Sequence, residues 1–341
     1  MTSSCRNSPS KTSTSRPCGF SGGLPYPALV GNDIGCGMAL WQTDLKAASV
    51  SLDKLERRVG NIDGPMDEEA SRAQAMAAHG VVAGAHDASL GTIGGGNHFA
   101  EFQQVDTVFD AGALSALGLD AKRLLLLVHT GSRGLGERIL RQHVDAVGHA
   151  GLDAETSEAA DYLARHGEAL RWAHCNRQLV AQRLLGNVRG AGRCVLDVHH
   201  NFLAPALIDG QAGWLHRKGA TPSDAGPVLI PGSRGDHSYL VRPLRLCHDT
   251  LLSLAHGAGR KWVRSACKDR LHKLMTPAQM GRTALGSRVI CNDRQLIYEE
   301  APQAYKGIDS VVQALVGTGL VELLARTRPV LTYKTRGGCC E

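Results

Sequence analysis

Residues 123–136, RLLLLVHTGSRGLG, show how this chain is built. The apolar run at 124–128 is typical of a buried strand, and it leads directly into a glycine turn that carries His129 and Arg133. A helix over about 135–147 is expected to follow the turn. The same order, a short apolar run and then a polar turn, recurs in CVLDVHHNF at 194–202 and in PVLIPGSRG at 227–235. The pattern predicts strands that end in functional side chains.

The chain is long enough for one large domain of mixed helix and sheet. Its 341 residues are 43% apolar, which allows a sizeable core. Further helices are expected at about 66–79, 155–187 and 260–274. No repeat of solenoid period and no Pro/Gly-rich linker divides the sequence. We therefore expect an α+β fold with one domain over 23–335, a disordered Ser/Thr-rich segment at 1–22 and a frayed tail at 336–341.

Net charge and cysteine content limit the partners and the cellular compartment that we expect for the protein. The net charge of +6 is compatible with an anionic partner such as RNA or a nucleotide, although charge alone does not identify one. The ten cysteines are mostly isolated and no signal peptide precedes them, which favours reduced thiols and a cytoplasmic location. No apolar run approaches the roughly 20 residues that a membrane span needs. We expect a cytoplasmic protein with no membrane partner.

Five residues in or beside glycine-rich turns are candidate metal ligands. Asp33 and Cys36 share the turn GNDIGCGM at 31–38, and three histidines end or follow strands: His98, His129 and His200. Each of them alone is also compatible with a structural role in the core. Together they offer oxygen, sulfur and nitrogen donors, more than one tetrahedral ion needs and enough for two ions that share the thiolate. Paired divalent ions are a recurrent solution for phosphoryl chemistry.

Other turns suggest that phosphate is bound nearby. The two GSRG segments, at 131–134 and 232–235, offer backbone N–H groups together with Arg133 and Arg234, although each is also compatible with an ordinary turn and a solvated arginine. The sequence has no GxxxxGK[ST] loop, no GxGxxG after a strand and no KxDG lysine signature. If a nucleotide is used, His256 in HGAGR is therefore the candidate nucleophile, at the start of the expected 260–274 helix. A buried structural histidine is the alternative.

Seven segments in this order resemble the RtcB family of RNA ligases: GNDIGCGM, GGGNHF, HTGSRG, HHNF, RKGAT, PGSRGDHSYL and HGAGR. The likeness covers about residues 24–334. It implies an α+β domain whose β-sheets are flanked by helices around a deep cleft for two manganese ions and a guanine nucleotide. It also implies ligation of RNA ends that carry a 3′-phosphate or 2′,3′-cyclic phosphate to 5′-hydroxyl ends.

The resemblance assigns roles residue by residue. Asp33, Cys36 and His98 would hold one Mn²⁺, and Cys36, His129 and His200 the other. His256 would attack the α-phosphate of GTP and carry GMP, and Arg133 would face the RNA phosphate. The remaining matched positions would bind the nucleotide beside His98, His200 and His256: Asn97, Glu101, Asn201, Pro231, Gly232, Ser233, Arg234, Ser238, Gly257, Ala258, Gly259 and Lys334. Glu101 suits guanine, whose N1–H and N2–H₂ groups are donors.

The chain also departs from the family pattern. The Ser/Thr-rich start stands where members usually carry several dozen residues that include a DVHxGxG-like segment, Arg234 stands where methionine is common, and Ala255 where serine is common. Two alternatives to a ligase therefore stay open: a two-metal phosphoesterase that does not ligate, and an N-terminally truncated, inactive RNA-binding relic. The segment PYPALVGNDIGCGM resembles the same segment in the bacterial branch of the family associated with the release-factor homologue PrfH. This resemblance would suggest a role in the repair of cleaved RNA.

Overall fold

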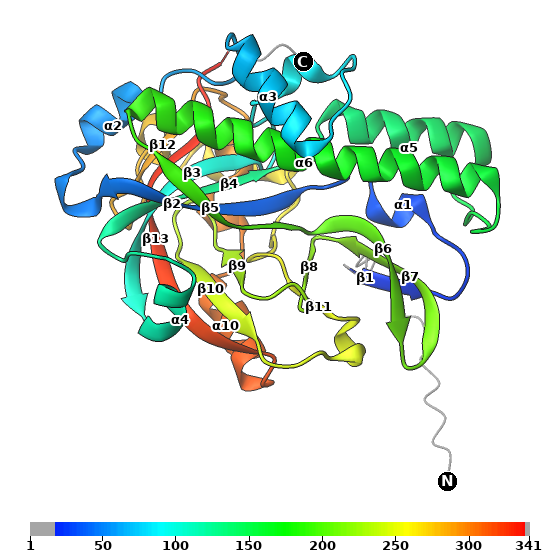
Figure 1. Cartoon of the computed structure of the whole chain (residues 1–341). Helices are drawn as coiled ribbons and strands as arrows, with labels where there is room; N and C mark the ends of the chain where they lie inside the picture. Colours follow the sequence, from blue (N-terminus) through cyan, green and yellow to red (C-terminus); the bar gives the residue numbers. More distant parts are fainter. Residues whose placement is uncertain (1–17, 338–341) are drawn as a thin grey trace.

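The computed structural model describes residues 18–337 and is organised around an eight-stranded sheet (Figure 1). Seven strands follow one another in the order β5-β2-β4-β3-β13-β10-β9, and β12 pairs in parallel with β13, whereas the other pairs are antiparallel. The bounds are β2 (Gly37–Lys46), β3 (Phe99–Val108), β4 (Arg123–Thr130), β5 (Gly192–His199), β9 (Val228–Pro231), β10 (Ser238–Pro243), β12 (Arg288–Cys291) and β13 (Val321–Thr335).

The continuous apolar run of β4 reflects a sheet that is covered on both faces. Successive side chains of a strand point to opposite faces. Leu124, Leu126 and Val128 therefore join one core cluster, whereas Leu125 and Leu127 join another on the opposite face. Burial on both faces removes the polar alternation that an exposed sheet face would impose.

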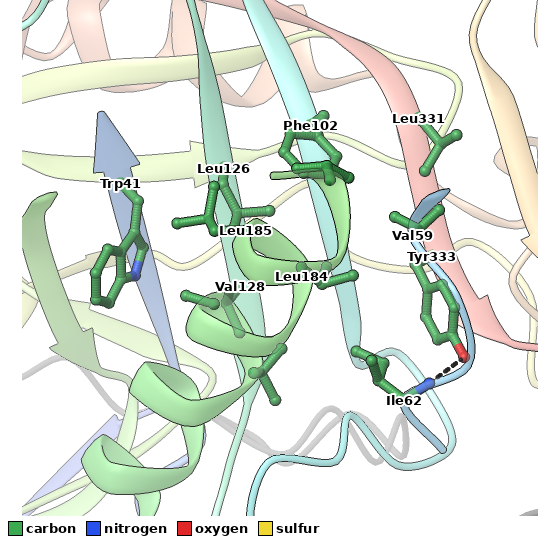
Figure 2. Packing of buried hydrophobic residues seen from close by; sticks show 14 of the residues in the cluster. Trp41, Val59, Ile62, Phe102, Leu126, Val128, Leu184, Leu185, Leu331 and Tyr333 are labelled. Carbon is green, nitrogen blue, oxygen red and sulfur yellow. Dashed lines mark hydrogen bonds between the residues drawn. The ribbon is translucent and has the colours of Figure 1, made fainter. Parts of the chain in front are cut away.

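The first face is covered by the long helix α6 (Ser157–Val188). Leu184 and Leu185 of this helix pack with Trp41, Leu126 and Val128 of the sheet (Figure 2). Tyr333 closes the same cluster, and its hydroxyl accepts a 3.1 Å hydrogen bond from the backbone N–H of Ile62 (Figure 2). The helix thus runs directly over the strands that end at the candidate ligands.

The remaining helices lie on both sides of the sheet (Figure 1). On the α6 side are α1 (Pro27–Val30), α2 (Leu52–Arg58), α3 (Glu69–His79) and α5 (Gly134–Val147). On the opposite side are α4 (Ala111–Ala116) and α10 (Ile308–Gly317). Three short helices come late in the chain: α7 (Ser265–Leu271), α8 (Pro277–Met280) and α9 (Leu296–Glu299). Four 3₁₀ turns are Ala47–Ser49, Asp87–Ser89, His248–Thr250 and Pro302–Ala304.

Two smaller sheets complete the fold. One has the order β1-β7-β6, formed by Cys18–Ser21, Gln211–Lys218 and Asn201–Ile208. The other pairs β8 (Ala220–Pro222) with β11 (Ser253–Ala255). The turn between β7 and β8 and the end of β11 bring Gly219 and His256 against the edge of the main sheet, because the N–H of Gly219 bonds to the carbonyl of His200.

Antiparallel pairing explains how distant segments meet. Where β2 begins, Gly37 is paired with Thr130 at the end of β4 and with His199 at the end of β5. Where β3 begins, Phe99 is paired with His129 of β4. The starts of two strands and the ends of two others therefore share one edge, and Cys36, His98, His129 and His200 all lie there.

The expected α+β fold with sheets flanked by helices is confirmed, as are helices close to 66–79, 135–147 and 155–187. The expected helix over 260–274 is wrong, because only Ser265–Leu271 is α-helical. Arg260 instead forms a β-bridge with Tyr305, and the backbone N–H of Lys261 bonds to Ala304. His256 therefore lies in a loop and not at the start of a helix. In the described part of the chain, no helix is long and apolar enough to cross a membrane.

Both expected terminal boundaries need correction. Residues 18–22 do not belong to a disordered segment, since Cys18–Ser21 forms β1 and pairs with β7. The expected frayed tail does not begin at 336, because Arg336 donates hydrogen bonds of 2.6 Å to the carbonyls of Gly60 and Glu56. The expectations for 1–17 and for 338–341 lie outside the described residues.

Candidate functional site

Three imidazoles converge on one buried sulfur atom. The Sγ atom of Cys36 lies 3.4 Å from Nε2 of His98, 3.2 Å from Nε2 of His129 and 3.3 Å from Nε2 of His200. Asp33 joins the cluster, with its Oδ2 atom 2.8 Å from Nε2 of His98. Cys36 and the three histidines are buried. The structure therefore brings together all five residues that the sequence suggests as metal ligands.

In His98 and His129, the hydrogen bonds of Nδ1 leave Nε2 available as a metal ligand. Nδ1 of His98 lies 3.2 Å from the carbonyl of Ile93, and Nδ1 of His129 lies 3.2 Å from the carbonyl of Asn97. A carbonyl can only accept, so each Nδ1 carries a hydrogen, and in the neutral ring Nε2 keeps a lone pair that can bind a metal beside the sulfur.

Asp33 adds an acceptor that no hydrogen bond satisfies. Its Oδ1 atom is buried and has no hydrogen-bond partner in the structure. A buried acceptor without a hydrogen-bond partner is costly, and a divalent cation beside it would remove that cost. The arrangement fits a metal.

The electrostatics of the cluster lead to the same conclusion. Burial raises the pKa of the Cys36 thiol well above its usual value, and the Asp33 carboxylate raises it further. Burial lowers the pKa of His129 and that of His200 well below the usual range, so both rings are neutral. Burial opposes ionisation of Asp33, but the charge and hydrogen bond of His98 hold its pKa below the usual value. A thiolate at Cys36 therefore needs a nearby cation.

Two glycines allow the close approaches on which the site depends. A Cβ atom on Gly131 would lie 2.2 Å from Oδ1 of Asp33, so any side chain there would displace the carboxylate. Gly219 has a φ of +71°, and a Cβ atom on it would lie 2.8 Å from Cε1 of His256. These positions explain why the turns that carry the site are rich in glycine.

A cavity of about 250 Å³ begins beside the Cys36 cluster, which is formed by Asp33, Cys36, His98, His129 and His200. His256 lies on its wall, and the ring of His256 is 4.7 Å from that of His200, measured between centroids. Burial lowers the pKa of His256, so its ring is neutral near pH 7. The other residues of the cavity wall expected from the sequence are Asn97, Glu101, Pro231, Gly232, Ser233, Arg234, Gly257, Ala258, Gly259 and Lys334.

The cavity contains a buried carboxylate and a buried amine. Glu101 accepts a 2.7 Å hydrogen bond from Nε2 of Gln103 and another from the hydroxyl of Thr332, and burial raises its pKa to about 7. Nζ of Lys334 donates a 2.6 Å hydrogen bond to the carbonyl of Gly96, and burial lowers its pKa to about 8. The cavity therefore offers an acceptor and a donor side by side.

Several expected nucleotide-binding residues do not lie on the cavity wall. His98 and His200 lie in the Cys36 cluster instead. Asn201 instead donates to the carbonyl of Asp33 at 3.1 Å and accepts from the N–H of Gly219 at 2.7 Å, so it joins two turns of the site. The hydroxyl of Ser238 accepts from Nε2 of Gln103 at 3.0 Å. Asn201 and Ser238 support the site from behind.

The two arginines of the GSRG turns are placed differently. Arg234 is buried on the cavity wall and donates a 2.9 Å hydrogen bond to the carbonyl of Ile297, so it is not a solvated surface arginine. Arg133 does not line the cavity. It packs against Gly94, where a Cβ atom would overlap its Nη1 atom at 1.4 Å, and its charge helps to lower the pKa of Asp33.

Sequence reasoning missed part of the cavity wall. Glu300 lies there with Arg260, Arg264 and Tyr305, in a network where Nη1 of Arg260 is 3.1 Å from Glu300 Oε1 and Tyr305 donates to Glu300. The sequence could have indicated the two arginines, since Arg260 ends the HGAGR segment and Arg264 is four residues later. It could not have indicated Glu300 and Tyr305, because neither lies in or beside a glycine-rich turn. The other missed residues are Met38, Phe99 and Thr332.

Comparisons with known proteins are consistent with this geometry. Residues 64–335 match the family model described as tRNA-splicing ligase RtcB. The chain is 55% identical over 322 residues to RNA-splicing ligase RtcB2 of Escherichia coli, covering 94% of this chain and 83% of that protein. It is 34% identical to tRNA-splicing ligase RtcB of Archaeoglobus fulgidus, over 71% of this chain and 58% of the relative. RNA-splicing ligase RtcB of Mycobacterium tuberculosis is also 34% identical, over 71% of this chain and 63% of the relative.

The variant Cys36→Ser is expected to lose metal binding while it keeps the fold. A serine hydroxyl is not a thiolate, so Mn²⁺ affinity should fall at least about 100-fold, more than is typical when an outer partner of a ligand is removed. Titration of Mn²⁺ followed by electron paramagnetic resonance measures this. The control is Cys194→Ser, an exposed cysteine of β5, which should bind as the wild type does. Equal Mn²⁺ affinity in both variants would refute the role of Cys36.

Proposed function

From the premise that this chain belongs to the RtcB family and is an RNA ligase, we propose that it uses GTP and Mn²⁺ to join RNA ends. The RNA would carry a 3′-phosphate or a 2′,3′-cyclic phosphate on one end and a 5′-hydroxyl on the other. The observation that carries the proposal is the position of His256, between the Cys36 cluster and a cavity that contains Glu101. The seven cysteines of the described part are free thiols, which supports action in the cytoplasm.

The five ligands divide into two sets that share Cys36. Asp33, Cys36 and His98 would hold one Mn²⁺, and Cys36, His129 and His200 would hold the other. The ions would neutralise charge on phosphoryl oxygens that attack and leave. Imidazole and thiolate donors also suit Zn²⁺, and manganese is proposed because the family resemblance implies it.

His256 is the proposed nucleophile. A neutral ring nitrogen would attack the α-phosphorus of GTP, forming a P–N bond as the bond from the α-phosphorus to pyrophosphate breaks. The 3′-phosphate of the RNA would then take GMP from His256, forming a P–O–P bond and restoring the free ring. Finally the 5′-hydroxyl would attack the RNA phosphorus, GMP would leave and the hydroxyl proton would pass to solvent. A cyclic phosphate end would first be opened by water.

The cavity wall supports guanine as the base. The Glu101 carboxylate can accept from both N1–H and N2–H₂, whereas adenine presents an acceptor at N1. Gln103 and Thr332 already hold this carboxylate in place. The 231–234 and 256–259 turns and Lys334 would cradle the rest of the nucleotide, and Arg133 would face the RNA phosphate.

The variant His256→Ala is expected to form no covalent GMP adduct and to keep Mn²⁺ affinity near that of the wild type. The measurement incubates protein with α-labelled GTP and Mn²⁺ and detects an acid-labile adduct. His248→Ala, on an exposed histidine, is the control and should form the adduct. Label on the His256 variant, or a wild type that opens cyclic ends without forming an adduct, would contradict the ligase mechanism.

Glu101→Gln is expected to reduce the preference for GTP over ATP by about tenfold or more, because a hydrogen bond to a charged group contributes about 1.5–3 kcal/mol. With a pKa of about 7, Glu101 gains a proton as the pH falls below that value and then accepts less well. GTP affinity of the wild type should therefore rise with pH through about 7, and the variant should lack this dependence. Competition binding at several pH values tests this, with Glu137→Gln on α5 as control. An unchanged GTP/ATP ratio would exclude Glu101 as the base reader.

A further inference from the structure

Two adjacent polar residues interrupt the buried side of α6. Asn176 and Arg177 are both 0% exposed, in a helix whose other buried side chains are mostly apolar. Burying an amide and a guanidinium is costly unless their polar groups are satisfied. Their partners are therefore informative, and nearly all of them lie in segments that carry candidate metal ligands.

Arg177 joins three of these segments. Its Nη1 atom donates to the carbonyl of Gly35 at 2.8 Å and to that of Thr130 at 2.9 Å, next to Cys36 and His129 respectively. Its Nε atom donates to Oδ1 of Asp197 at 2.6 Å, and its Nη2 atom lies 3.2 Å from Nδ1 of His199, immediately before His200. One planar guanidinium thus holds the backbone next to Cys36 and His129, and it holds a side chain of the strand that leads to His200.

Asn176 is linked to the fourth of these residues, His98. Its Oδ1 atom accepts from the N–H of Gly91 at 2.8 Å, and its Nδ2 atom lies 3.2 Å from the carbonyl of Thr92 and 3.3 Å from the hydroxyl of Thr130. That hydroxyl donates at 2.8 Å to the carbonyl of Ile93, which is also the partner of His98 Nδ1. A chain of hydrogen bonds therefore leads from α6 to the ring of His98.

The helix is suited to this role because it is rigid and anchored elsewhere. Its C-terminal turns are held in the main core by residues such as Leu184 and Leu185. Turns rich in glycine do not fix their own geometry, whereas a metal site needs its ligands placed within about 0.5 Å. A lysine at 177 could not replace the arginine, because one ammonium group cannot span acceptors on separate segments as a planar fork does.

We infer that Asn176 and Arg177 are positioning residues that set the spacing of Cys36, His98, His129 and His200 and thereby determine metal affinity. The identity of the ion as Mn²⁺ rests on the proposed function. The positioning role itself is tested by measuring metal affinity, which does not depend on any reaction with GTP.

The test compares Mn²⁺ dissociation constants of the full chain and of Arg177→Lys, with thermal unfolding of the metal-free proteins measured in parallel. Arg177→Lys is expected to weaken binding by about 10–100-fold, as is typical when an outer partner of metal ligands is lost. Asn176→Ala should act in the same direction and decides the matter if the lysine variant does not fold. Co²⁺ absorption bands from the Cys36 thiolate should change in both variants.

The matched control is Arg171→Lys, on the same helix. Arg171 also donates to a backbone carbonyl, that of Gly80 at 3.2 Å, which lies at the end of α3 and not in a segment that carries a candidate ligand. It should keep wild-type affinity. The inference is overturned if Arg177→Lys and Asn176→Ala bind Mn²⁺ like the wild type while only their unfolding temperatures fall, or if Arg171→Lys loses as much affinity. A wild type that binds Mn²⁺ but forms no GMP adduct would contradict the proposed function and leave this comparison intact.

Discussion

The structure depends on one constraint: a buried sulfur with three imidazole nitrogens within 3.4 Å. Two of the imidazoles are held by backbone carbonyls so that their Nε2 atoms face the Cys36 sulfur, and the buried Oδ1 of Asp33 has no donor. A buried acceptor without a donor is unfavourable by itself. A shared pair of cations would turn the same atoms into a favourable set of metal ligands, which is why a metal is central to the proposed function.

The antiparallel sheet makes that convergence possible. Strands β2 and β3 begin, and β4 and β5 end, at one edge, so four segments far apart in the sequence deliver their side chains to one point. Helix α6 runs over one face of the sheet (Figure 1) and bonds to backbone carbonyls of these segments through Asn176 and Arg177. His256 reaches the cluster from the smaller β8–β11 sheet, on the side where the cavity opens.

Much of the fold and of the site could be predicted from the sequence where a residue and its neighbours carry the signal. The apolar run of β4 indicated a strand, and the helical pattern over 155–187 indicated α6. Glycine-rich turns indicated Cys36, His129 and His256 as candidate site residues. Features set by distant partners could not be predicted. Arg260 forms a bridge with Tyr305 and does not continue a helix, Glu300 reaches the cavity from a segment without a marked turn, and Arg177 resembles any polar position of a long helix.

The central claim is that Cys36 bridges two cations beside His256. Anomalous diffraction from crystals grown with Mn²⁺ tests it most directly, because the scattering locates each ion independently of the ligands. The account predicts two peaks that both contact Cys36 Sγ, one near Asp33 and His98 and the other near His129 and His200. A single peak, or peaks that do not contact the sulfur, would contradict it.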